Sequence, residues 1–277
     1  DLVQDQISTS HPYGALTVPK LSEAVNVFYT KPEIFYIPFS PRLGTYMDEI
    51  GGMVALVEIR PDEDLSDFEN FGNSKNVVGT TKMLEQLNED NDDEVDAYSY
   101  LRARYLDMLL GDWDRHNDQW RWAEIELENG NRIFKPIPRD RDQAFSNFDG
   151  AFFGTLRGLT GIANQFAVYG PDIKDLKWFN TAASGLDRTI IQNVGRETWI
   201  EQAKYLQENL TDEVIKEAFA ELPKETQGEI TNSIIESLKA RRGNIVDIAK
   251  RYYDYIAQLA IITATDKAVK QGVLASP

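Results

Sequence analysis

The nine residues from Gly111 to Gln119 have the sequence GDWDRHNDQ, and they follow a segment with a helical pattern. Apolar side chains recur at three- and four-residue spacing between Tyr98 and Leu109, which predicts an amphipathic helix whose stripe forms core. Asp96 stands where this helix needs an N-cap, and Gly111 stands where it should end. The nine residues are therefore predicted to be a loop that starts at a helix end.

A β-hairpin is predicted directly after this loop. Strands over 120–127 and 133–137 flank a turn from Glu128 to Gly130, in which the Asn-Gly dipeptide signals a two-residue turn. The second strand leads into another acidic stretch, PIPRDRDQAF, at residues 136–145. Because the ends of the two strands of a hairpin lie together, the second acidic stretch is expected to return beside the first.

The two acidic stretches carry the residue types that phosphoryl transfer requires. The reaction needs a carboxylate that orients or deprotonates the acceptor hydroxyl, and ligands for the metal ions that hold the phosphates. Asp114 and Gln119 offer a carboxylate and an amide on one loop, and Asp140 or Asp142 offers a second carboxylate. The alternative for Asp112 and Asp114 is a helix-terminating loop whose aspartates make Asx-turn hydrogen bonds.

The first stretch resembles the catalytic loops of several atypical kinase families. Asp-Arg-His at 114–116, with an amide three residues past the histidine, resembles the loop of phosphoinositide-type kinases and of the secreted casein-kinase-like (CotH-like) family. It also resembles the loop of HipA-type toxin kinases, and LSEA at 21–24 with VALVEIR at 54–60 is similar to their approach to the nucleotide hinge. Residues 111–122 and 136–145 look closer still to an uncharacterised family of exported Bacteroidetes proteins. In that family they accompany calcineurin-like phosphoesterase or outer-membrane surface-antigen domains, and the resemblance covers most of the chain.

The resemblance implies a role for each matching residue of the site. Asp114 resembles the catalytic aspartate, and His116 shares or takes the role of the base. Gln119 stands where these families usually place a metal-binding asparagine. Asp140 resembles the metal-binding aspartate, with Asp142 as the alternative if the register differs by two residues. The implied cofactor is Mg²⁺ or Mn²⁺, with ATP as a substrate.

The resemblance also implies a nucleotide-binding side. The residues at the adenine-facing hinge, acting through backbone groups, would be Glu58, Ile59 and Arg60. Arg115, with Arg139 and Arg141, is suited to neutralise phosphate charge, although balancing the acidic cluster explains these arginines equally well. The phosphate-binding lysine and glycine-rich loop of kinases have no match. They are expected to lie upstream of Asp1, in a longer protein of which this chain is a fragment or processed product.

The implied fold class is α+β and protein-kinase-like, in two parts. Residues 1–62 would form a partial N-terminal lobe with antiparallel strands, and residues 63–277 a mostly helical C-terminal lobe with the catalytic loop and the metal-binding hairpin. Strands are predicted at 33–38 and 52–59, and the second is so continuously apolar that a central place in a sheet is expected. Residues 197–257 are predicted to be helical.

Residues 61–96 are polar, and neither a helix nor a strand is predicted in them. The run from Glu89 to Glu94 invites a calcium-loop interpretation, but it lacks the glycine at the sixth loop position and the closing glutamate. A solvated loop is therefore expected there.

Composition narrows the classes of function. The chain has 45 acidic and 29 basic residues and a net charge of −16, which argues against nucleic-acid binding because phosphate contact needs a basic face. The absence of cysteine excludes disulfides, thiolate catalysis and zinc–thiolate sites. Two histidines are too few for a typical two-metal phosphoesterase. No apolar run approaches the roughly 18 residues of a membrane span, so no membrane insertion by this segment is expected.

Three functions are consistent with these features. The first is a kinase-like phosphotransferase that moves the γ-phosphoryl group of a nucleotide to a hydroxyl of an unknown protein or small molecule. The second is an inactive kinase-like interaction module of a larger exported or outer-membrane-associated protein, with a fused phosphoesterase or outer-membrane domain as its partner. The third and weakest is a metal-dependent phosphohydrolase. Export is implied by the family resemblance alone.

Overall fold

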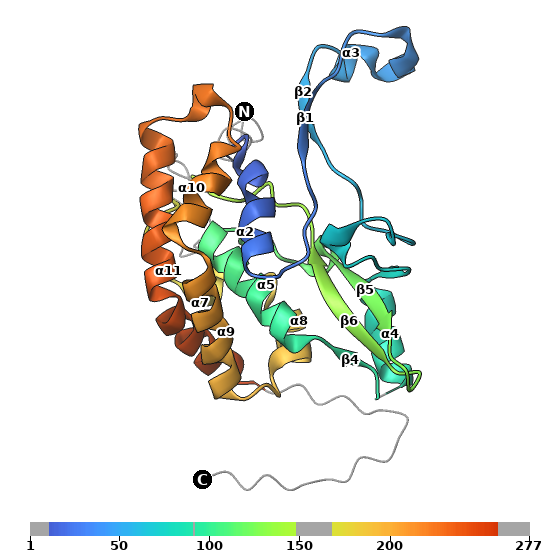
Figure 1. Cartoon of the computed structure of the whole chain (residues 1–277), viewed down its shortest axis with the longest axis vertical. Helices are drawn as coiled ribbons and strands as arrows, with labels where there is room; N and C mark the ends of the chain where they lie inside the picture. Colours follow the sequence, from blue (N-terminus) through green and yellow to red (C-terminus); the bar gives the residue numbers. More distant parts are fainter. Residues whose placement is uncertain (1–10, 91, 148–167, 260–277) are drawn as a thin grey trace, which may run out of the picture.

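The protein is described here from a computed structural model, which describes residues 11–90, 92–147 and 168–259. Figure 1 shows three parts: a group of helices, a small sheet against one side of it, and a thin two-stranded ribbon that projects from the sheet side. The predicted lobes 1–62 and 63–277 both extend into segments outside the described residues, and their boundary stays a prediction.

The projecting ribbon is formed by strands β1 (Glu33–Tyr36) and β2 (Val54–Val57). They pair antiparallel with Glu33 opposite Val57, and the short helix α3 (Met47–Ile50) lies in the connection between them. The strands agree with the sequence, but the central place expected for the second is wrong. Val54 is 57% exposed and Tyr36 is 62% exposed, because β2 pairs only with β1 and no second layer of described residues covers the ribbon.

The main sheet has four strands in the order β3-β5-β6-β4. Its members are β3 (Val77–Gly79), β4 (Glu94–Val95), β5 (Trp120–Glu126) and β6 (Arg132–Pro138). The pairs β3–β5 and β5–β6 are antiparallel, and β4 runs parallel to β6. Helix α4 (Thr80–Glu89) follows β3 directly. The polar stretch 61–96 therefore holds two strands and a helix that the sequence did not predict.

The hairpin β5–β6 is present as predicted, but its turn is longer than expected. The backbone N–H of Leu127 donates to the carbonyl of Asn131 at 2.8 Å, which leaves three residues in the turn rather than two. The N–H of Gly130 donates to the carbonyl of Leu127, and Gly130 has a φ of 86°. This is the three-residue hairpin in which a glycine in the left-handed region closes a type I turn.

The two faces of the hairpin pack against different clusters. Trp120, Trp122 and Phe134 belong to the main core, which includes most of helix α5 (Ala97–Leu110). The opposite face contributes side chains to a second, smaller cluster, whose buried members are Leu65, Phe71, Val77, Ala123 and Ile137. The alternation of side chains along a strand produces this division. The hairpin is thus packed on both of its faces. This packing also restricts the position of its open end.

Helix α5 agrees with the prediction at both ends. The carboxylate of Asp96 accepts a hydrogen bond from the backbone N–H of Ser99 at 3.0 Å, which satisfies one of the free donors of the first turn. The helix ends at Gly111, whose φ of 76° is the left-handed conformation that favours glycine at this position. Residues from Leu101 to Leu110 are almost all buried, so α5 forms the centre of the helical part.

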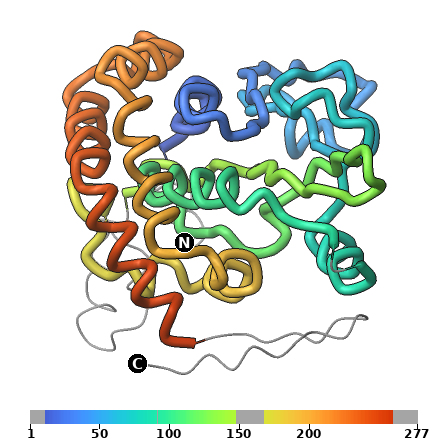
Figure 2. Tube along the Cα trace, turned by 60° about the horizontal axis from the view of Figure 1, so that its bottom comes forward, coloured from blue at the N-terminus to red at the C-terminus, as the bar shows by residue number. Residues whose placement is uncertain are grey.

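Further helices surround α5. They are α2 (Val18–Ala24), α7 (Leu176–Phe179), α8 (Ser184–Ile191), α9 (Arg196–Asn209), α10 (Asp212–Ala220) and α11 (Glu229–Ile256). Thr211 caps α10 by accepting from the N–H of Val214 at 3.3 Å. Helices α9 and α11 run side by side on the side away from the ribbon (Figures 1 and 2). The helical prediction for 197–257 is confirmed, apart from the connections between these helices.

The architecture is mixed α+β, with small mainly antiparallel sheets and a helical remainder. This confirms the expected class at that level. Within the part of the chain that the structure describes, no helix is long and apolar enough to cross a bilayer.

Candidate functional site

The two acidic stretches lie side by side at the open end of the hairpin. Trp120 is paired with Pro138, and the backbone N–H of Arg139 donates to the carbonyl of Gln119 at 3.1 Å. The N–H of Phe145 donates to the carbonyl of Leu110 at 2.8 Å, so the second stretch also closes back on the end of α5. The expectation that the hairpin returns the second stretch beside the first is confirmed.

A chain of side-chain contacts joins the two stretches. Gln119 Nε2 donates to Asp140 Oδ2 at 2.9 Å and lies 3.4 Å from His116 Nε2. His116 Nδ1 accepts a hydrogen bond from the backbone N–H of Asp118 at 3.2 Å. Since Nδ1 is an acceptor, the proton of the neutral ring is on Nε2. Three of the predicted site residues therefore form one cluster: His116, Gln119 and Asp140.

Asp140 has an unusual backbone conformation for a residue with a side chain. Its φ is 56°, in the left-handed region that only a few per cent of such residues adopt, with aspartate among the types that tolerate it. Backbone conformations of this kind collect at functional sites because the surrounding structure must hold them. Here the hydrogen bond from Gln119 and the pairing at Arg139 hold the turn.

Asp142 lies close to two other carboxylates at this point. The pKa of Asp142 is raised above its ordinary value, first by burial and then by the negative charges of Asp140 and Asp114, while a hydrogen bond from Gln143 opposes the rise. Asp114 and Asp140 thus lie within electrostatic range of the same neighbour. Among the described residues, no group of three or more His, Cys, Asp or Glu side chains is arranged to hold a metal ion.

Arg115 lies beneath the site rather than at its surface. Its side chain is buried, and its guanidinium donates to the carbonyls of Arg139 (2.7 Å) and Gln119 (3.0 Å). The same group is 3.4 Å from Asp112 Oδ2 and lies over the ring of Trp120 at 4.9 Å. These contacts are with groups of the protein on both acidic stretches, so Arg115 ties the two stretches together from the inside.

A buried ionic network continues from Arg115 into the helical part. Arg141 pairs with Asp112 at 3.1 Å and with Asp107 of α5, and Arg104 joins Asp107 to Asp187 of α8. Burial raises the pKa of Asp112 to about 6, although Arg115 and Arg141 lower it and Asp107 raises it further. Buried charges persist only when paired, so this network fixes the loop rigidly relative to the helices.

The predicted hinge residues are on the surface at the base of the ribbon. Glu58 and Arg60 are exposed, and Ile59 is exposed by 46%. Arg60 is close enough to Arg121 of β5 for its charge to affect the pKa of that side chain. The segment therefore passes the sheet near the open end of the hairpin, on the side of Arg121.

Two residues near the site were not indicated by the sequence. Asp107 is a carboxylate within the apolar run of α5, and that position was itself a signal of a buried ion pair. Arg121 lies on β5 one position beyond Trp120, on the opposite face. Its neighbours come from three separate segments, so no local pattern could indicate its surroundings.

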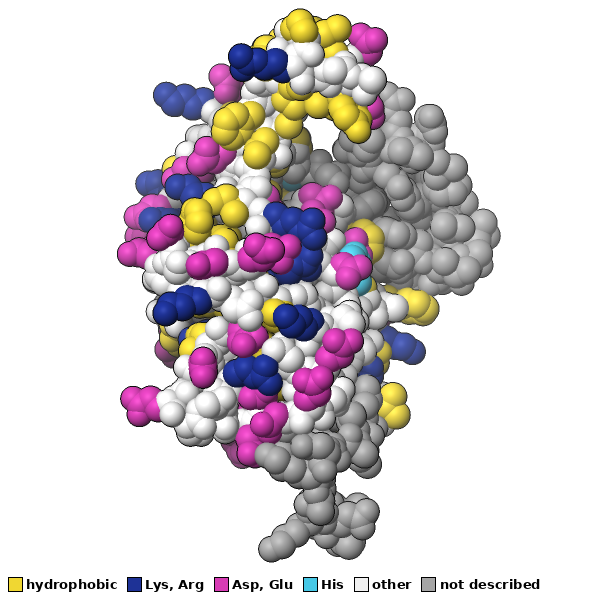
Figure 3. All heavy atoms as spheres, turned by 90° about the vertical axis from the view of Figure 1, so that its right-hand side faces the viewer, with side chains coloured by type: hydrophobic (Ala, Val, Ile, Leu, Met, Phe, Trp, Pro, Cys, Tyr) yellow, Lys and Arg dark blue, Asp and Glu magenta, His cyan; other side chains and the backbone are white. Residues whose placement is uncertain are grey.

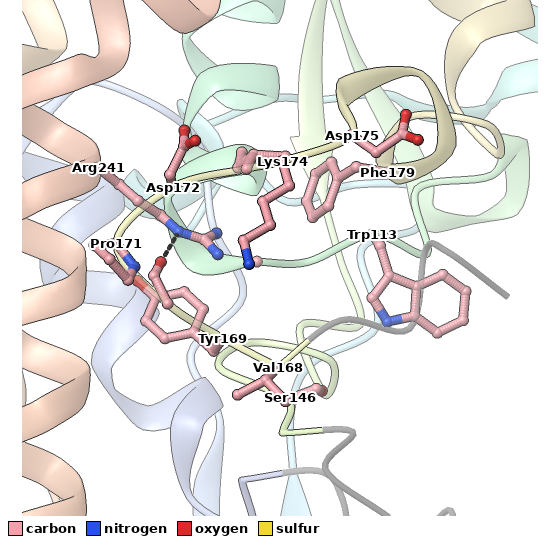
Figure 4. A pocket seen from close by; sticks show the side chains of 13 residues that line it. Trp113, Ser146, Val168, Tyr169, Pro171, Asp172, Lys174, Asp175, Phe179 and Arg241 are labelled. Atoms are coloured by element: carbon pink, nitrogen blue, oxygen red, sulfur yellow. Dashed lines mark hydrogen bonds between the residues drawn. The ribbon is translucent and has the colours of Figure 1, made fainter. Parts of the chain in front are cut away.

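A cavity of about 820 Å³ opens on the other side of the loop. Trp113 lines one side of it, and Tyr169, Asp172 and Arg241 line the other (Figure 4). Arg241 Nε donates to the carbonyl of Gly170 at 2.6 Å, and its guanidinium lies 4.2 Å from the centre of the Tyr169 ring. Arg241 is thus held by contacts with Tyr169 and Gly170.

Comparison with known proteins gives little. No protein-family model and no curated protein matches this chain. Among solved structures, it is similar to the crystal structure of the Helicobacter pylori proinflammatory kinase CtkA, with 11% sequence identity and a TM-score of 0.37, over 89% of this chain and 81% of that one. A likeness at that TM-score carries no weight for function, which rests on the site itself.

Proposed function

We propose that the chain is a kinase-like phosphotransferase domain whose two acidic stretches bind a nucleotide together with Mg²⁺ or Mn²⁺. The observation that carries the proposal is the contact between the stretches. Gln119 and Asp140 touch at 2.9 Å across the open end of the hairpin, and Asp114 lies within electrostatic range of the same cluster. We interpret this contact as part of a metal and nucleotide site because these positions resemble the catalytic and metal-binding residues of atypical kinases.

The donor set fits a hard divalent cation. Asp140 and Asp142 supply carboxylate oxygens, and Gln119 supplies an amide oxygen. The pKa of Asp142 is raised first by burial and then by the negative charges of Asp140 and Asp114, and a cation would neutralise that charge. Mg²⁺ is usually held by one or two carboxylates plus the phosphates of a substrate, rather than by a complete protein cage.

Gln119 would take a second orientation when the proposed cation is bound. In the structure, its amide nitrogen faces both Asp140 and Nε2 of His116. Rotation of the amide by half a turn would present Oε1 to His116 Nε2–H, which would donate to it, and to the space beside Asp140. A cation bound there would supply the charge that allows two oxygens to face each other. His116 would then hold Gln119 in its metal-binding orientation.

Asp114 has the role of orienting the acceptor. It accepts the proton of the acceptor hydroxyl while the oxygen of that hydroxyl bonds to the γ-phosphorus, and the bond from that phosphorus to the β–γ bridging oxygen breaks to release the nucleoside diphosphate. Bound Mg²⁺ or Mn²⁺ neutralises the charge of the phosphates. Backbone groups of residues 58–60 face the adenine.

The proposal is tested by thermal unfolding with and without millimolar MgATP. A ligand that binds the folded state at about 100 times its Kd adds about 2.7 kcal/mol of stability, which is a readily measured shift in Tm. We expect this shift for the wild type, for Asp114→Asn and for the control Asp48→Asn, whose exposed side chain lies on α3 of the ribbon. We expect its loss in Asp140→Asn. No shift for the wild type would overturn the proposal.

A second function, an inactive interaction module, is favoured by one observation. The ribbon exposes a row of apolar side chains, which include Phe35, Tyr36, Phe39 and Val54. Exposed patches of this kind mark interaction surfaces. An assay for phosphate transfer from MgATP to a hydroxyl separates the two functions. The enzyme would transfer phosphate in the wild type and lose this activity in Asp114→Asn, whereas the module would bind nucleotide without transfer. Export and a fused phosphoesterase or outer-membrane domain stay part of this second proposal.

A further inference from the structure

Two arginines lie on the same face of the hairpin beside the site. Arg121 is on β5, opposite Ile137 of β6, and Arg139 follows β6 with its N–H bonded to the carbonyl of Gln119. Residues 119, 121, 137 and 139 therefore point to one side of the sheet, and the two arginines are diagonal neighbours across the strands. Arg121 is two residues after Gln119, and Arg139 directly precedes Asp140.

A third arginine approaches them from the ribbon. Arg60 follows β2, and its positive charge, with that of Arg139, lowers the pKa of Arg121. Burial is the largest cause of that lowering, and the charges of Asp62 and Asp118 oppose it. Figure 3 shows Lys and Arg side chains gathered near the middle of the face below the ribbon, beside a histidine and acidic side chains.

Within the described part of the chain, none of these three arginines forms an ion pair. Arg121 donates to backbone carbonyls, those of Trp120 at 2.9 Å and Asp118 at 3.5 Å. By contrast, Arg115 and Arg141 of the same turns are paired with carboxylates. In a chain with 45 acids and 29 bases, these guanidiniums have no carboxylate of the described residues at ion-pair distance, although Asp62 and Asp118 lie within electrostatic range of Arg121. Such a group is stabilised by an anion that arrives from outside.

We propose that Arg121 and Arg139 form a clamp for the phosphate chain of a nucleoside triphosphate, and that this clamp does the work of the phosphate-binding lysine that the chain does not match. The clamp rests on the proposed function for the identity of its ligand. Its position on the same face as Gln119, next to Asp140 in the chain, would let one polyphosphate contact the arginines and a divalent cation at once. Planar guanidiniums suit this task because each donates two hydrogen bonds to one phosphate group.

The test uses inorganic tripolyphosphate in the presence of EDTA, with binding measured by calorimetry. The clamp predicts binding by the wild type that weakens at least tenfold in Arg121→Gln and in Arg139→Gln, and more in the pair. Arg42→Gln is the control, because this arginine is exposed on the ribbon connection and has no ion pair among the described residues. Its affinity should equal that of the wild type. Asp140→Asn should bind tripolyphosphate at least as well, since it removes a negative charge beside the clamp.

A second titration with MgATP separates this inference from the proposed function. Loss of MgATP binding in Asp140→Asn, with no effect of Arg121→Gln or Arg139→Gln on either ligand, would overturn the clamp and leave the proposed function standing. Arginine-dependent binding of tripolyphosphate without any binding of MgATP would support an anion site and overturn the proposed function. Equal weakening in Arg42→Gln would show nonspecific attraction and overturn the clamp. Unfolding in urea checks that each variant is folded.

Discussion

Asp112 is a fully buried carboxylate whose charge is balanced by two arginines. Its pKa is raised to about 6 in the folded protein, first by burial, against an ordinary value of 3.8. The folded state thus keeps a proton that the unfolded state has already lost. The resulting stability is fully present below pH 4 and is lost as the pH rises from about 4 to about 6. Two pKa units correspond to about 3 kcal/mol of unfolding free energy.

The prediction for this residue is a change in the shape of a pH profile. In Asp112→Asn, the unfolding free energy should fall less steeply than in the wild type between pH 4 and 6, because the amide does not titrate. The measurement is urea unfolding at a series of pH values, and the difference between the two curves isolates residue 112. Asp48→Asn should give a curve parallel to that of the wild type. A constant offset between wild type and Asp112→Asn across this range contradicts the assignment.

At the scale of elements, two glycines allow the cost of backbone strain to be separated from the cost of a packing clash. Gly130 closes the hairpin turn with a φ of 86°, and an added Cβ there meets nothing within 4 Å. Gly111 ends α5 with a φ of 76°, and an added Cβ there would lie 2.8 Å from the ring of Tyr169. Tyr169 is held by a hydrogen bond from its hydroxyl to the carbonyl of Leu109 at 2.8 Å.

We expect Gly130→Ala to cost about 1–2 kcal/mol, the strain of a left-handed residue alone. Gly111→Ala should cost more, because the ring of Tyr169 must move as well. Urea unfolding of the two variants gives the comparison, and the tyrosine variant Tyr169→Leu combined with Gly111→Ala should show a coupling between the two sites. Equal costs at both glycines would contradict the packing argument.

The elements also show what a sequence can and cannot specify. Helix α5 and the hairpin were predictable because a cap, a closing glycine and a turn signal are local features. The amphipathic stripe expected for α5 was wrong, because Arg104 and Asp107 are buried along with the apolar residues and Tyr98 is 54% exposed. Helix α4 was missed because its residues are mostly polar and its buried side, with Met83, is narrow. Continuous apolar character predicted burial for β2, but burial depends on what covers a strand, and no described residue covers this one.

The candidate site was predictable where it is built from one loop and one hairpin. The contact between Gln119 and Asp140 could be expected because pairing in the hairpin brings the two stretches together, while the roles assigned to these residues and to Asp114 stay predictions. The buried network was not predictable, since Asp107, Arg141 and Asp187 meet only after the helices have packed. Arg60 and Arg121 come together for the same reason, through contacts between segments far apart in the sequence.

On the scale of the whole molecule, the proposed nucleotide site would draw on two parts of the structure. The helical part supplies the loop and the network that fixes it, and the segment that follows the ribbon supplies residues 58–60. The open end of the hairpin lies between them, with acidic groups on the turns and arginines on the neighbouring face. A ligand with a cation, a phosphate chain and a flat apolar base would contact both parts.

The central claim is that residues of the two acidic stretches share one divalent cation with a nucleotide. The most direct test is a crystal structure with Mn²⁺ and a non-hydrolysable ATP analogue, in which anomalous scattering locates the metal. The account predicts one Mn²⁺ about 2.1 Å from a carboxylate oxygen of Asp140, with the amide oxygen of Gln119 turned toward it and the base beside residues 58–60. Nucleotide density elsewhere on the molecule, or Mn²⁺ without contact to Asp140 or Asp142, would contradict it.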